Sequence, residues 1–574
     1  MPPQTGPKPN LLTLMKPYRG ILWLLVLCTL LANGGNLVVP KIIERGIDGF
    51  VSGNLGIDRM VIEFSVVAIL IFIFTYLQTV LQTYTAERVA RDLRTRLANK
   101  ISHQAYAFID KEGPAKLLTN LTSDADAVKN FFSQGIASVI SSIFLIIGAS
   151  ILLFITNWKL ALLVLSIVPI IGIAFSIIFS KVKKLFIRAQ ATIDWLNKVI
   201  NESILGAALI RLVNAEGYEY QKFLKANTEA KDVSVSILNL FASLIPIITF
   251  FTNLATLAIL MLGGHYVIMG TMTLGAFTAF NTYLAILIFP IIIIGFTSTV
   301  IAQATASYGR MLAVIDAPDA KDEGTITLPL SGSVAVKDVT LTYGEKSTLK
   351  DITFEAKPST RTAIIGPTAA GKTQLLSVLT GLIAPTTGEV LYDGRKIEEY
   401  NKEKLYAQIG FVFQDSIMFN LSLRENIAFG GTVNEVGLMK AIETAELSDF
   451  IDALPHGLET FVSERGTSLS GGQKQRVMLA RALALNPKIL LLDDFTARVD
   501  TRTEKKILEN IKNNYPDITL ISVTQKIASV EDYDQIIVLM EGEVIARGKH
   551  KELLETSPEY VQMYQSQEST EHLT

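Results

Sequence analysis

Six long, almost uncharged apolar runs precede residue 302, and they constrain the fold of this chain more than any other feature. Each approaches or exceeds the ~20 residues that an α-helix needs to cross the hydrocarbon core of a bilayer. Charged residues make up only 18% of the 574 residues, whereas a soluble protein carries about a quarter. We therefore predict membrane-spanning helices rather than buried helices of a large soluble protein. The runs are Gly20–Val39, Met60–Thr83, Phe131–Thr156, Leu160–Ser180, Val235–Leu262 and Leu274–Ile301.

The loops between the runs predict their orientation. Runs two and three, and runs four and five, are separated by long segments rich in Lys and Arg. The connections Asn157–Lys159 and Gly263–Thr273 are short and carry one basic residue between them. Because basic loops stay on the cytoplasmic side, both long loops and both termini are expected in the cytoplasm. We expect an integral protein of a bacterial-type inner membrane.

The pattern within the long loops remains helical. In Ala86–Ala105, apolar residues recur at helical spacing among basic ones. The helices are therefore expected to continue beyond the membrane and to turn back near Lys111–Ala125 and Ala207–Tyr220.

Charge and polar content narrow the function. The net charge of −2 gives no electrostatic bias, so no nucleic-acid partner is expected. Cys28 is the only cysteine, which excludes an intrachain disulfide and favours a buried, inert thiol. Polar residues inside the runs are few and are more typical of bridges between helices than of an ion pathway. This favours an apolar or amphipathic substrate. The residues in question are Glu63, Asn253, Asn281, Tyr283 and Gln303.

The composition changes after residue 315, where a polar linker (316–332) precedes a second domain (333–574). Strand-like runs lie at Ser333–Tyr343 and Ile352–Ala356. A buried strand, Arg361–Gly366, then leads into a glycine-rich turn and a helix that begins near Lys372. The predicted fold class is an α-helical six-span transmembrane domain (1–315) followed by an α/β P-loop NTPase domain.

The glycine-rich turn has the pattern of a phosphate-binding loop. Its backbone N–H groups would hold phosphate oxygens, Lys372 would reach the β- and γ-phosphates, and the Thr373 hydroxyl would ligate Mg²⁺. The predicted contacts for ATP are Gly366, Pro367, Thr368, Ala369, Ala370, Gly371, Lys372, Thr373 and Gln374.

A second stretch, Leu469–Asp500, completes the nucleotide machinery. A Ser-Gly-Gly-Gln turn is followed by a helix and then by the wholly apolar run Ile489–Leu492, as expected of a central parallel strand. That strand would deliver Asp493 to the magnesium shell and Asp494 to the position of a general base or water-orienting carboxylate.

Together these motifs resemble the exporter-type half-transporters of the ATP-binding cassette (ABC) superfamily over nearly the whole chain. The signature Leu469-Ser-Gly-Gly-Gln473 is the most specific of them. The segments Phe108–Val128, Asn157-Trp-Lys-Leu160 and Ser463-Glu-Arg-Gly466 are similar to the family's first intracellular loop, its turn between helices three and four, and a loop before the signature.

The resemblance implies roles for further residues. Tyr343 matches the aromatic residue that stacks on adenine, and Gln414 matches the loop glutamine that touches Mg²⁺ and the membrane domain. In the family, two nucleotide domains close head to tail around two ATP molecules, each held between one subunit's phosphate loop and the other subunit's signature. The signature residues Ser470, Gly471, Gly472 and Gln473 would therefore contact the ATP of a second half-transporter.

Three positions depart from the family pattern. Asp494 stands where a glutamate is usual, which sets the carboxylate back by ~1.5 Å, and such misplacement can cost about a hundredfold in rate. Gln525 replaces the switch histidine and cannot relay a proton. Thr496-Ala-Arg-Val-Asp500 replaces Ser-Ala-Leu-Asp. We therefore expect this chain's own ATP site to hydrolyse slowly, and its partner to be a different chain that carries the glutamate and the histidine.

Alternatives stay open at this point. The chain could form a homodimeric exporter, an importer of a metal chelate or siderophore built on the exporter fold, or a non-transporting membrane regulator that senses ATP. The identity of the substrate does not follow from the residues.

Overall fold

The chain folds into two compact units. The structure is a computed structural model that describes residues 10–53, 56–319, 324–343, 346–430, 433–463, 466, 468–495 and 498–571. The first unit holds Met1–His103 and Glu112–Pro318, and the second holds Gln104–Lys111 and Asp319–Thr574. The division at residue 318 falls within the linker predicted at 316–332. The short segment Gln104–Lys111, from the first long loop, groups with the second unit.

In the first unit, six helical stretches are long and apolar enough to cross a membrane, counted over the described residues. Each contains one of the predicted apolar runs, so the prediction of six apolar helices is confirmed. The stretches are Thr13–Val51, Ile57–Ser102, Pro114–Thr156, Trp158–Leu205, Glu216–Ile268 and Leu274–Ile315. The α-helices that build them are α1 (Leu11–Met15), α2 (Arg19–Val51), α3 (Ile57–Ser102), α5 (Pro114–Thr119), α6 (Ala125–Asn130), α7 (Ile136–Thr156), α8 (Trp158–Leu165), α9 (Ile167–Leu205), α11 (Glu216–Ala258), α12 (Gly264–Ile268) and α13 (Leu274–Ile315).

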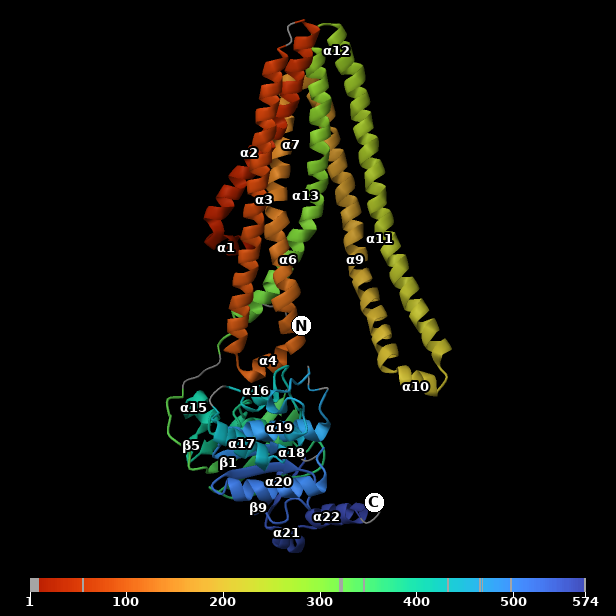
Figure 1. The fold of residues 1–574 in the computed structure, drawn as a ribbon. Helices are drawn as coiled ribbons and strands as arrows, with labels where there is room; N and C mark the ends of the chain where they lie inside the picture. Colours follow the sequence, from red (N-terminus) through yellow and green to blue (C-terminus); the bar gives the residue numbers. More distant parts are fainter. Residues whose placement is uncertain are drawn as a thin grey trace. The chain divides into compact units, whose positions relative to one another are not determined.

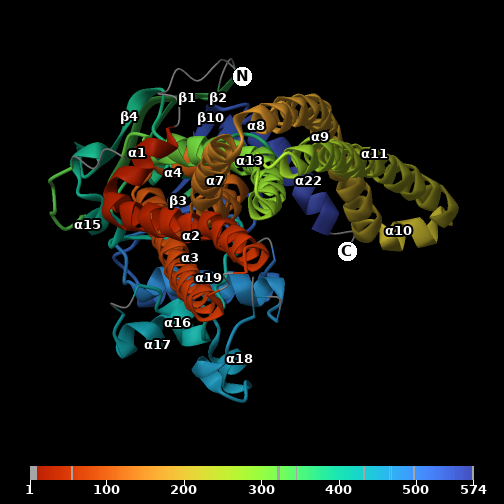
Figure 2. The same cartoon turned by 90° about the horizontal axis from the view of Figure 1, so that it is seen from above.

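The helices of this unit form two groups. Helices α2, α3, α7 and α13 lie side by side, and α9 and α11 form a long pair joined by the short α10 (Ala207–Leu212) (Figures 1 and 2). The helices continue beyond the apolar runs and turn back, as predicted. The first turn includes α4 (Tyr106–Glu112) and so begins slightly before the expected range Lys111–Ala125; within that range Gly113 has a left-handed φ of +82° and Pro114 starts the next helix.

Helix α2 continues through Pro40 to Val51, beyond the predicted end of the run at Val39. A proline inside a helix removes one backbone N–H from the helical hydrogen-bond ladder. Near this point, the buried Tyr283 of α13 donates its hydroxyl to the Leu37 carbonyl at 3.0 Å. Tyr283 therefore joins two helices, as expected of a polar residue inside an apolar run.

Several other polar residues in the runs also have partners. The Ser141 hydroxyl of α7 donates to Asn33 Oδ1 of α2 at 3.0 Å. Glu63 forms ion pairs with Arg45 and Arg59, each at 3.1 Å, whereas Asn281 donates to a carbonyl of its own helix. Cys28 is buried, as predicted.

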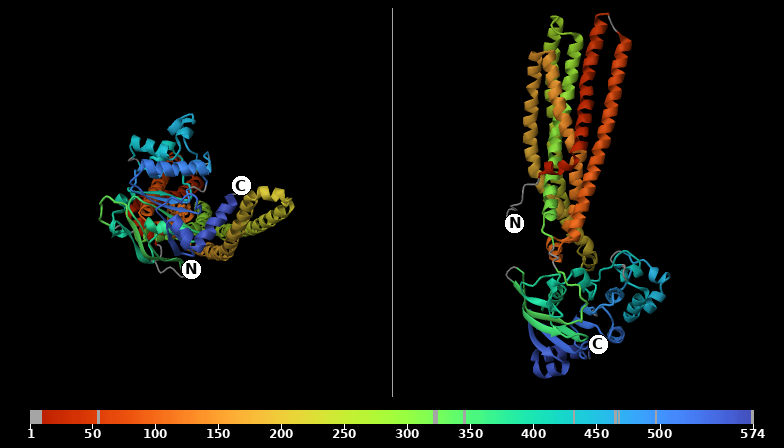
Figure 3. Two further views of the ribbon diagram at one scale, coloured as in Figure 1. Left: turned by 90° about the horizontal axis from the view of Figure 1, so that it is seen from below. Right: turned by 90° about the vertical axis from the view of Figure 1, so that its left-hand side faces the viewer.

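The second unit contains two β-sheets with helices packed around them (Figure 3). The four-stranded antiparallel sheet has the order β2-β1-β4-β5, and the six-stranded sheet has the order β10-β9-β3-β8-β7-β6. The strands are β1 (Val334–Tyr343), β2 (Lys346–Ala356), β3 (Arg361–Ile365), β4 (Thr387–Tyr392), β5 (Arg395–Lys396), β6 (Ile409–Val412), β7 (Ile489–Asp493), β8 (Thr519–Thr524), β9 (Gln535–Met540) and β10 (Glu543–Gly548). The helices are α14 (Lys372–Leu379), α15 (Lys402–Tyr406), α16 (Leu423–Ile427), α17 (Glu435–Thr444), α18 (Ser448–Asp452), α19 (Gly471–Ala484), α20 (Thr501–Asn514), α21 (His550–Thr556) and α22 (Pro558–Glu571).

Strand β7 explains why its sequence is apolar without alternation. It pairs in parallel with β6 on one side and β8 on the other. Leu490 and Leu492 belong to one buried cluster, and Ile489 and Leu491 belong to another. Both faces of the sheet are therefore covered, which confirms the predicted central parallel strand.

Candidate nucleotide-binding site

The phosphate-loop motif lies between strand β3 and helix α14, as predicted. A Cβ atom at Gly366 would lie 2.0 Å from the Leu539 carbonyl oxygen, so the loop requires glycine there. Lys372 begins α14 and is buried, and its Nζ donates to the carbonyls of Gly366 at 2.7 Å and Pro367 at 2.8 Å. Burial lowers the pKa of Lys372, while the nearby Asp494 and Asp493 raise it.

The loop thus holds a cation at the N-terminus of a helix, and this combination suits phosphate. Pro367, Thr368 and Ala369 are exposed on the loop, whereas Ala370 and Gly371 are buried beneath it. Thr373 and Gln374 follow in the first turn of α14.

Asp493 ends strand β7 within reach of this loop. The Thr373 hydroxyl donates to Asp493 Oδ1 at 3.3 Å. Asp493 is 2% exposed. Burial raises the pKa of its carboxyl, and the hydrogen bond from Thr373 opposes that effect. A hydroxyl and a carboxylate side by side are hard oxygen donors of the kind that Mg²⁺ takes alongside phosphate oxygens, so these residues fit the predicted metal.

Three further predicted residues lie just after the ends of strands, at the same edge of the sheet. In the register of the parallel strands, Asp493 is paired with Val523, Ile365 with Thr524, and Val412 with Leu492. The phosphate loop, Asp494, Gln525 and Gln414 therefore all follow the carboxyl ends of adjacent strands. This is where parallel α/β sheets bind ligands.

Asp494 is partly buried, and its φ of +46° lies in the left-handed region. Burial raises the pKa of its carboxyl, and the charges of Lys372 and Lys526 lower it. Gln414 and Gln525 are exposed.

Tyr343 ends strand β1 and is 51% exposed, so its ring is accessible. Leu341, two residues earlier, is paired with Leu349 of β2. A Cβ atom at Gly371 would lie 2.9 Å from Leu349 Cδ2, which brings this end of β1 close to the phosphate loop. Burial raises the pKa of the Tyr343 hydroxyl, and the charges of Asp110 and Tyr106 add to that effect.

The signature residues form the first turn of α19 rather than a turn before it, which corrects the predicted boundary. Ser470 is the N-cap, and it exchanges hydrogen bonds with Gln473 in a capping box. A Cβ atom at Gly472 would lie 2.8 Å from the Arg498 carbonyl oxygen, so this glycine allows the chain after β7 to approach the helix. Gly471 lies against the side chain of the same arginine.

Parts of two predicted motifs lie outside the described residues. These are Glu464 and Arg465 before the signature, and Thr496 and Ala497 after Asp494.

We call Gln525–Ile527 the switch segment. The residues that bind this segment belong to none of the sequence motifs and were not predicted. Lys526 forms an ion pair with the buried Glu504 of α20 at 3.0 Å. The Gln567 side chain of α22 bonds the backbone at both ends of the segment. Neither partner belongs to a motif, and only the folded chain brings them together.

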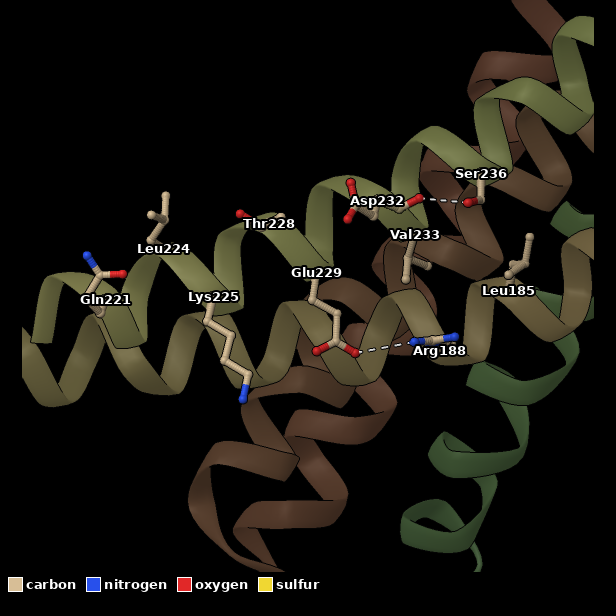
Figure 4. Close-up of a pocket in the computed structure, with 10 residues that line it drawn as sticks. All are labelled: Leu185, Arg188, Gln221, Leu224, Lys225, Thr228, Glu229, Asp232, Val233 and Ser236. Carbon is tan, nitrogen blue, oxygen red and sulfur yellow. Dashed lines mark hydrogen bonds and ion pairs between the residues drawn. The ribbon is translucent and has the colours of Figure 1, made fainter. Parts of the chain in front are cut away.

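A separate pocket of about 510 Å³ lies between α9 and α11 in the first unit (Figure 4). Arg188 and Glu229 face each other there across 3.5 Å, so two of its charged groups already neutralise one another. The pocket brings together none of the predicted site residues.

Both halves of the chain match known protein families. A family profile for the ABC transporter transmembrane region matches residues 22–291, and a profile for the ABC transporter matches residues 349–497. The ABC transporter ATP-binding protein YfiB of Bacillus subtilis (strain 168) is 32% identical and covers 97% of this chain and 98% of its own length. The ATP-dependent lipid A-core flippase of Syntrophus aciditrophicus (strain SB) is 28% identical, with 97% and 94% covered.

A solved structure of a bacterial Atm1-family ABC exporter with ATP bound shares the fold. Its TM-score is 0.77 at 24% identity, and the match covers 96% of this chain and 98% of that one. The six apolar helices, the phosphate loop on a parallel sheet and these matches lead to one conclusion: the chain belongs to the ABC transporter family and is an exporter-type half-transporter with an ATP-binding domain.

Proposed function

We propose that this chain is one half of a dimeric ABC exporter that uses ATP to move an apolar or amphipathic molecule across a bilayer. The observation that carries this proposal is the edge of the six-stranded sheet. There the phosphate loop, Asp493, Asp494, Gln414 and Gln525 follow adjacent strand ends, in a chain with six apolar helices.

In this proposal the ATP phosphates bind to the loop Gly366–Gly371 and to Lys372, and adenine stacks on Tyr343. Thr373 and Asp493, with Gln414, hold Mg²⁺, which supplies charge neutralisation for the phosphates when it is bound. The contact between Thr373 and Asp493 supports this role. Ser470, Gly471, Gly472 and Gln473 serve the ATP of the partner subunit.

A second half-transporter is needed because one chain supplies one phosphate loop and one signature. The exposed apolar side chains at the α9–α11 turn support such a partner. Leu209 and Leu212 of α10 are 63% and 84% exposed, so two large apolar side chains of this turn are open to contact with a partner.

We further propose that this chain's own ATP site is slow in hydrolysis. Asp494 carries a carboxylate that is one methylene shorter than glutamate, and burial favours its protonated form. Gln525 donates a hydrogen bond but does not relay a proton. The partner therefore carries the glutamate and the histidine, and the nucleotide domains lie on the cytoplasmic side of an inner membrane.

Two observations support the proposed substrate class. Several polar groups inside the helices are paired, among them Glu63 with its two arginines and Tyr283 with a backbone carbonyl. One relative is named an ATP-dependent lipid A-core flippase, so its name points to a lipid substrate. An amphipathic lipid or lipid-like molecule is the substrate that we would test first.

The experiment measures ATP hydrolysis by this chain alone and together with the product of the neighbouring gene, both in nanodiscs. Fast hydrolysis only by the pair is expected. Hydrolysis by the chain alone at the rate of the pair would indicate a homodimer and would overturn the slow-site proposal.

Transport is then measured in inside-out vesicles that contain the pair. ATP-dependent accumulation of a fluorescent lipid or drug inside the vesicles is expected. Loss of a metal chelate from loaded vesicles would instead indicate an importer, and hydrolysis without any transport would indicate a regulator.

A further inference from the structure

The switch segment is bound on one side by a side chain that no motif predicts. Gln567 Nε2 donates to the Gln525 carbonyl at 2.7 Å, and the Ile527 N–H donates to Gln567 Oε1 at 2.9 Å. One amide therefore satisfies both backbone groups that flank Lys526. Gln567 comes from α22, more than forty positions later in the chain.

The other anchors of the segment act on the residues on either side of the exposed Gln525, and they include the ion pair of Lys526 with Glu504. Thr524, the last residue of β8, is buried, and its hydroxyl accepts the Lys526 N–H at 3.1 Å. Ile527 is fully buried. Gln525 lies between these two anchors and is exposed. The peptide that follows Gln525 is thus held by two hydrogen bonds, one from Gln567 to its carbonyl and one from its N–H to the Thr524 hydroxyl.

Packing does not replace this hydrogen bond. A pocket of about 590 Å³ lies between the segment and α22, and its lining includes Gln525, Ala528, Tyr564 and Gln567. Open space beside the segment gives its backbone room to shift when the amide is removed.

Helix α22, which carries Gln567, is packed against the rest of the second unit. Tyr560 is fully buried, and its hydroxyl lies 2.7 Å from His550 Nδ1 of α21. Met563 and Tyr564 pack against the main apolar cluster of the second unit. The amide of Gln567 is therefore attached to the core of the domain rather than to a loose end.

We propose that Gln567 is a positioning residue that holds Gln525 where it can contact the γ-phosphate of bound ATP. This inference rests on the proposed function, because it takes Gln525 to be a γ-phosphate contact. It adds that the last helix described, α22, controls how well the site distinguishes ATP from ADP.

The binding test uses the full chain in nanodiscs with Mg²⁺ and compares the non-hydrolysable ATP analogue AMP-PNP with ADP by displacement of a fluorescent nucleotide. Gln567→Ala should raise the Kd for AMP-PNP by about fivefold or more, since hydrogen bonds to charged groups are strong. The Kd for ADP should stay unchanged, because ADP has no γ-phosphate. The matched control is Gln565→Ala, an exposed glutamine on the same helix, which should change neither Kd.

A double-mutant comparison separates positioning from a general structural effect. In the Gln525→Ala background, Gln567→Ala should have no further effect on AMP-PNP binding. Equal losses for AMP-PNP and ADP, or additive losses in the double variant, would overturn the proposal.

Hydrogen exchange tests the contact itself. The Ile527 amide should exchange faster in Gln567→Ala, whereas Gln567→Glu, which keeps an acceptor, should retain its protection. Unchanged exchange in Gln567→Ala would also overturn the proposal. These readouts require neither hydrolysis nor transport, so they are separate from the failure of the proposed export function.

Discussion

At the scale of single residues, Asp494 is the position on which the proposal of a slow ATP site most depends. Its left-handed φ of +46° is tolerated better by Asp and Asn than by larger side chains. Burial also favours its protonated form, while Lys372 and Lys526 oppose that effect. The short side chain therefore suits the left-handed backbone at this position. It is poorly suited to act as the general base proposed for ATP hydrolysis.

Lengthening this side chain should restore hydrolysis. Asp494→Glu combined with Gln525→His is expected to raise ATP turnover by the chain alone at least about tenfold, because a carboxylate misplaced by ~1 Å can cost about a hundredfold. The measurement is steady-state phosphate release, with Lys372→Ala in the same background as the inactive control. No gain in turnover would show that the slow step lies elsewhere.

Burial of the Asp493 carboxylate should lower the free energy of unfolding of the nucleotide-free protein. Because burial raises its pKa above the ordinary value of 3.8, ionisation costs the folded state more than the unfolded state, and the folded state loses stability as the pH rises through about 4 toward neutrality. Asp493→Asn should therefore raise the Tm of the nucleotide domain at pH 7 by ~2–4 °C for each ~1 kcal/mol removed.

This gain should shrink as the pH falls through about 4 toward about 3, because the wild-type carboxyl becomes protonated in both states there. The same variant should lose the stabilisation that Mg²⁺ and ATP give the wild type. A Tm difference that is independent of pH would contradict the assigned cause. Calorimetry of the full chain with and without nucleotide makes both comparisons.

At the scale of elements, one ion pair fastens the end of α13 to the first long loop. Asp124, in the π-helical turn Asn120–Asp124 between α5 and α6, is buried and pairs with Arg310 of α13. Arg310 also donates to the Ser307 hydroxyl at 3.0 Å. The guanidinium is half exposed, so the carboxylate is the member of the pair that depends on its partner.

Removing the arginine should therefore destabilise the helical unit more than removing the acid. Arg310→Ala leaves a buried carboxylate without its cation, at a cost of about 1–3 kcal/mol after allowance for the exposure of the arginine. Asp124→Asn should cost less. The control is Arg94→Ala, which breaks the exposed pair with Asp126 and should change Tm little. Thermal unfolding in nanodiscs ranks the three variants, and equal effects of Arg310→Ala and Arg94→Ala would contradict the argument.

Sequence reasoning found those elements whose pattern is local. The apolar runs, strands β3 and β7 and the start of α14 follow from length, burial on both faces and the glycine-rich turn. It missed the extension of α2 through Pro40, because a proline and the polar residues after it end an apolar run without ending a helix. It also missed the bond of Gln567 to the switch segment and that of Lys526 to Glu504, since these contacts join residues that only the tertiary fold brings together.

At the scale of the whole molecule, the proposed transporter has two unequal ATP sites. This chain would give a normal signature to one site, and Asp494 and Gln525 to the other. Because the catalytic residues are divided unequally between the two sites, mutation of the strand-end carboxylate should have different effects in the two subunits.

That inequality is testable with one substitution in each subunit. Changing the partner's strand-end glutamate to glutamine should reduce ATP turnover of the pair about a thousandfold, as removal of an essential catalytic group does. Asp494→Asn should reduce it less than about threefold. ATPase rates of the two purified pairs decide, and equal losses would mean that both sites hydrolyse ATP.

Cys28 has a practical consequence for all of these tests. It is the only thiol in the sequence, and it is buried within α2. A buried thiol reacts slowly with maleimides and methanethiosulfonates, so a cysteine introduced on α10 or α22 would carry a spin label or fluorophore almost alone. The natural sequence can therefore serve, without removal of Cys28, as the starting protein for site-directed spin labelling. Distances measured by pulsed electron spin resonance could then follow the motion of each half through the ATP cycle.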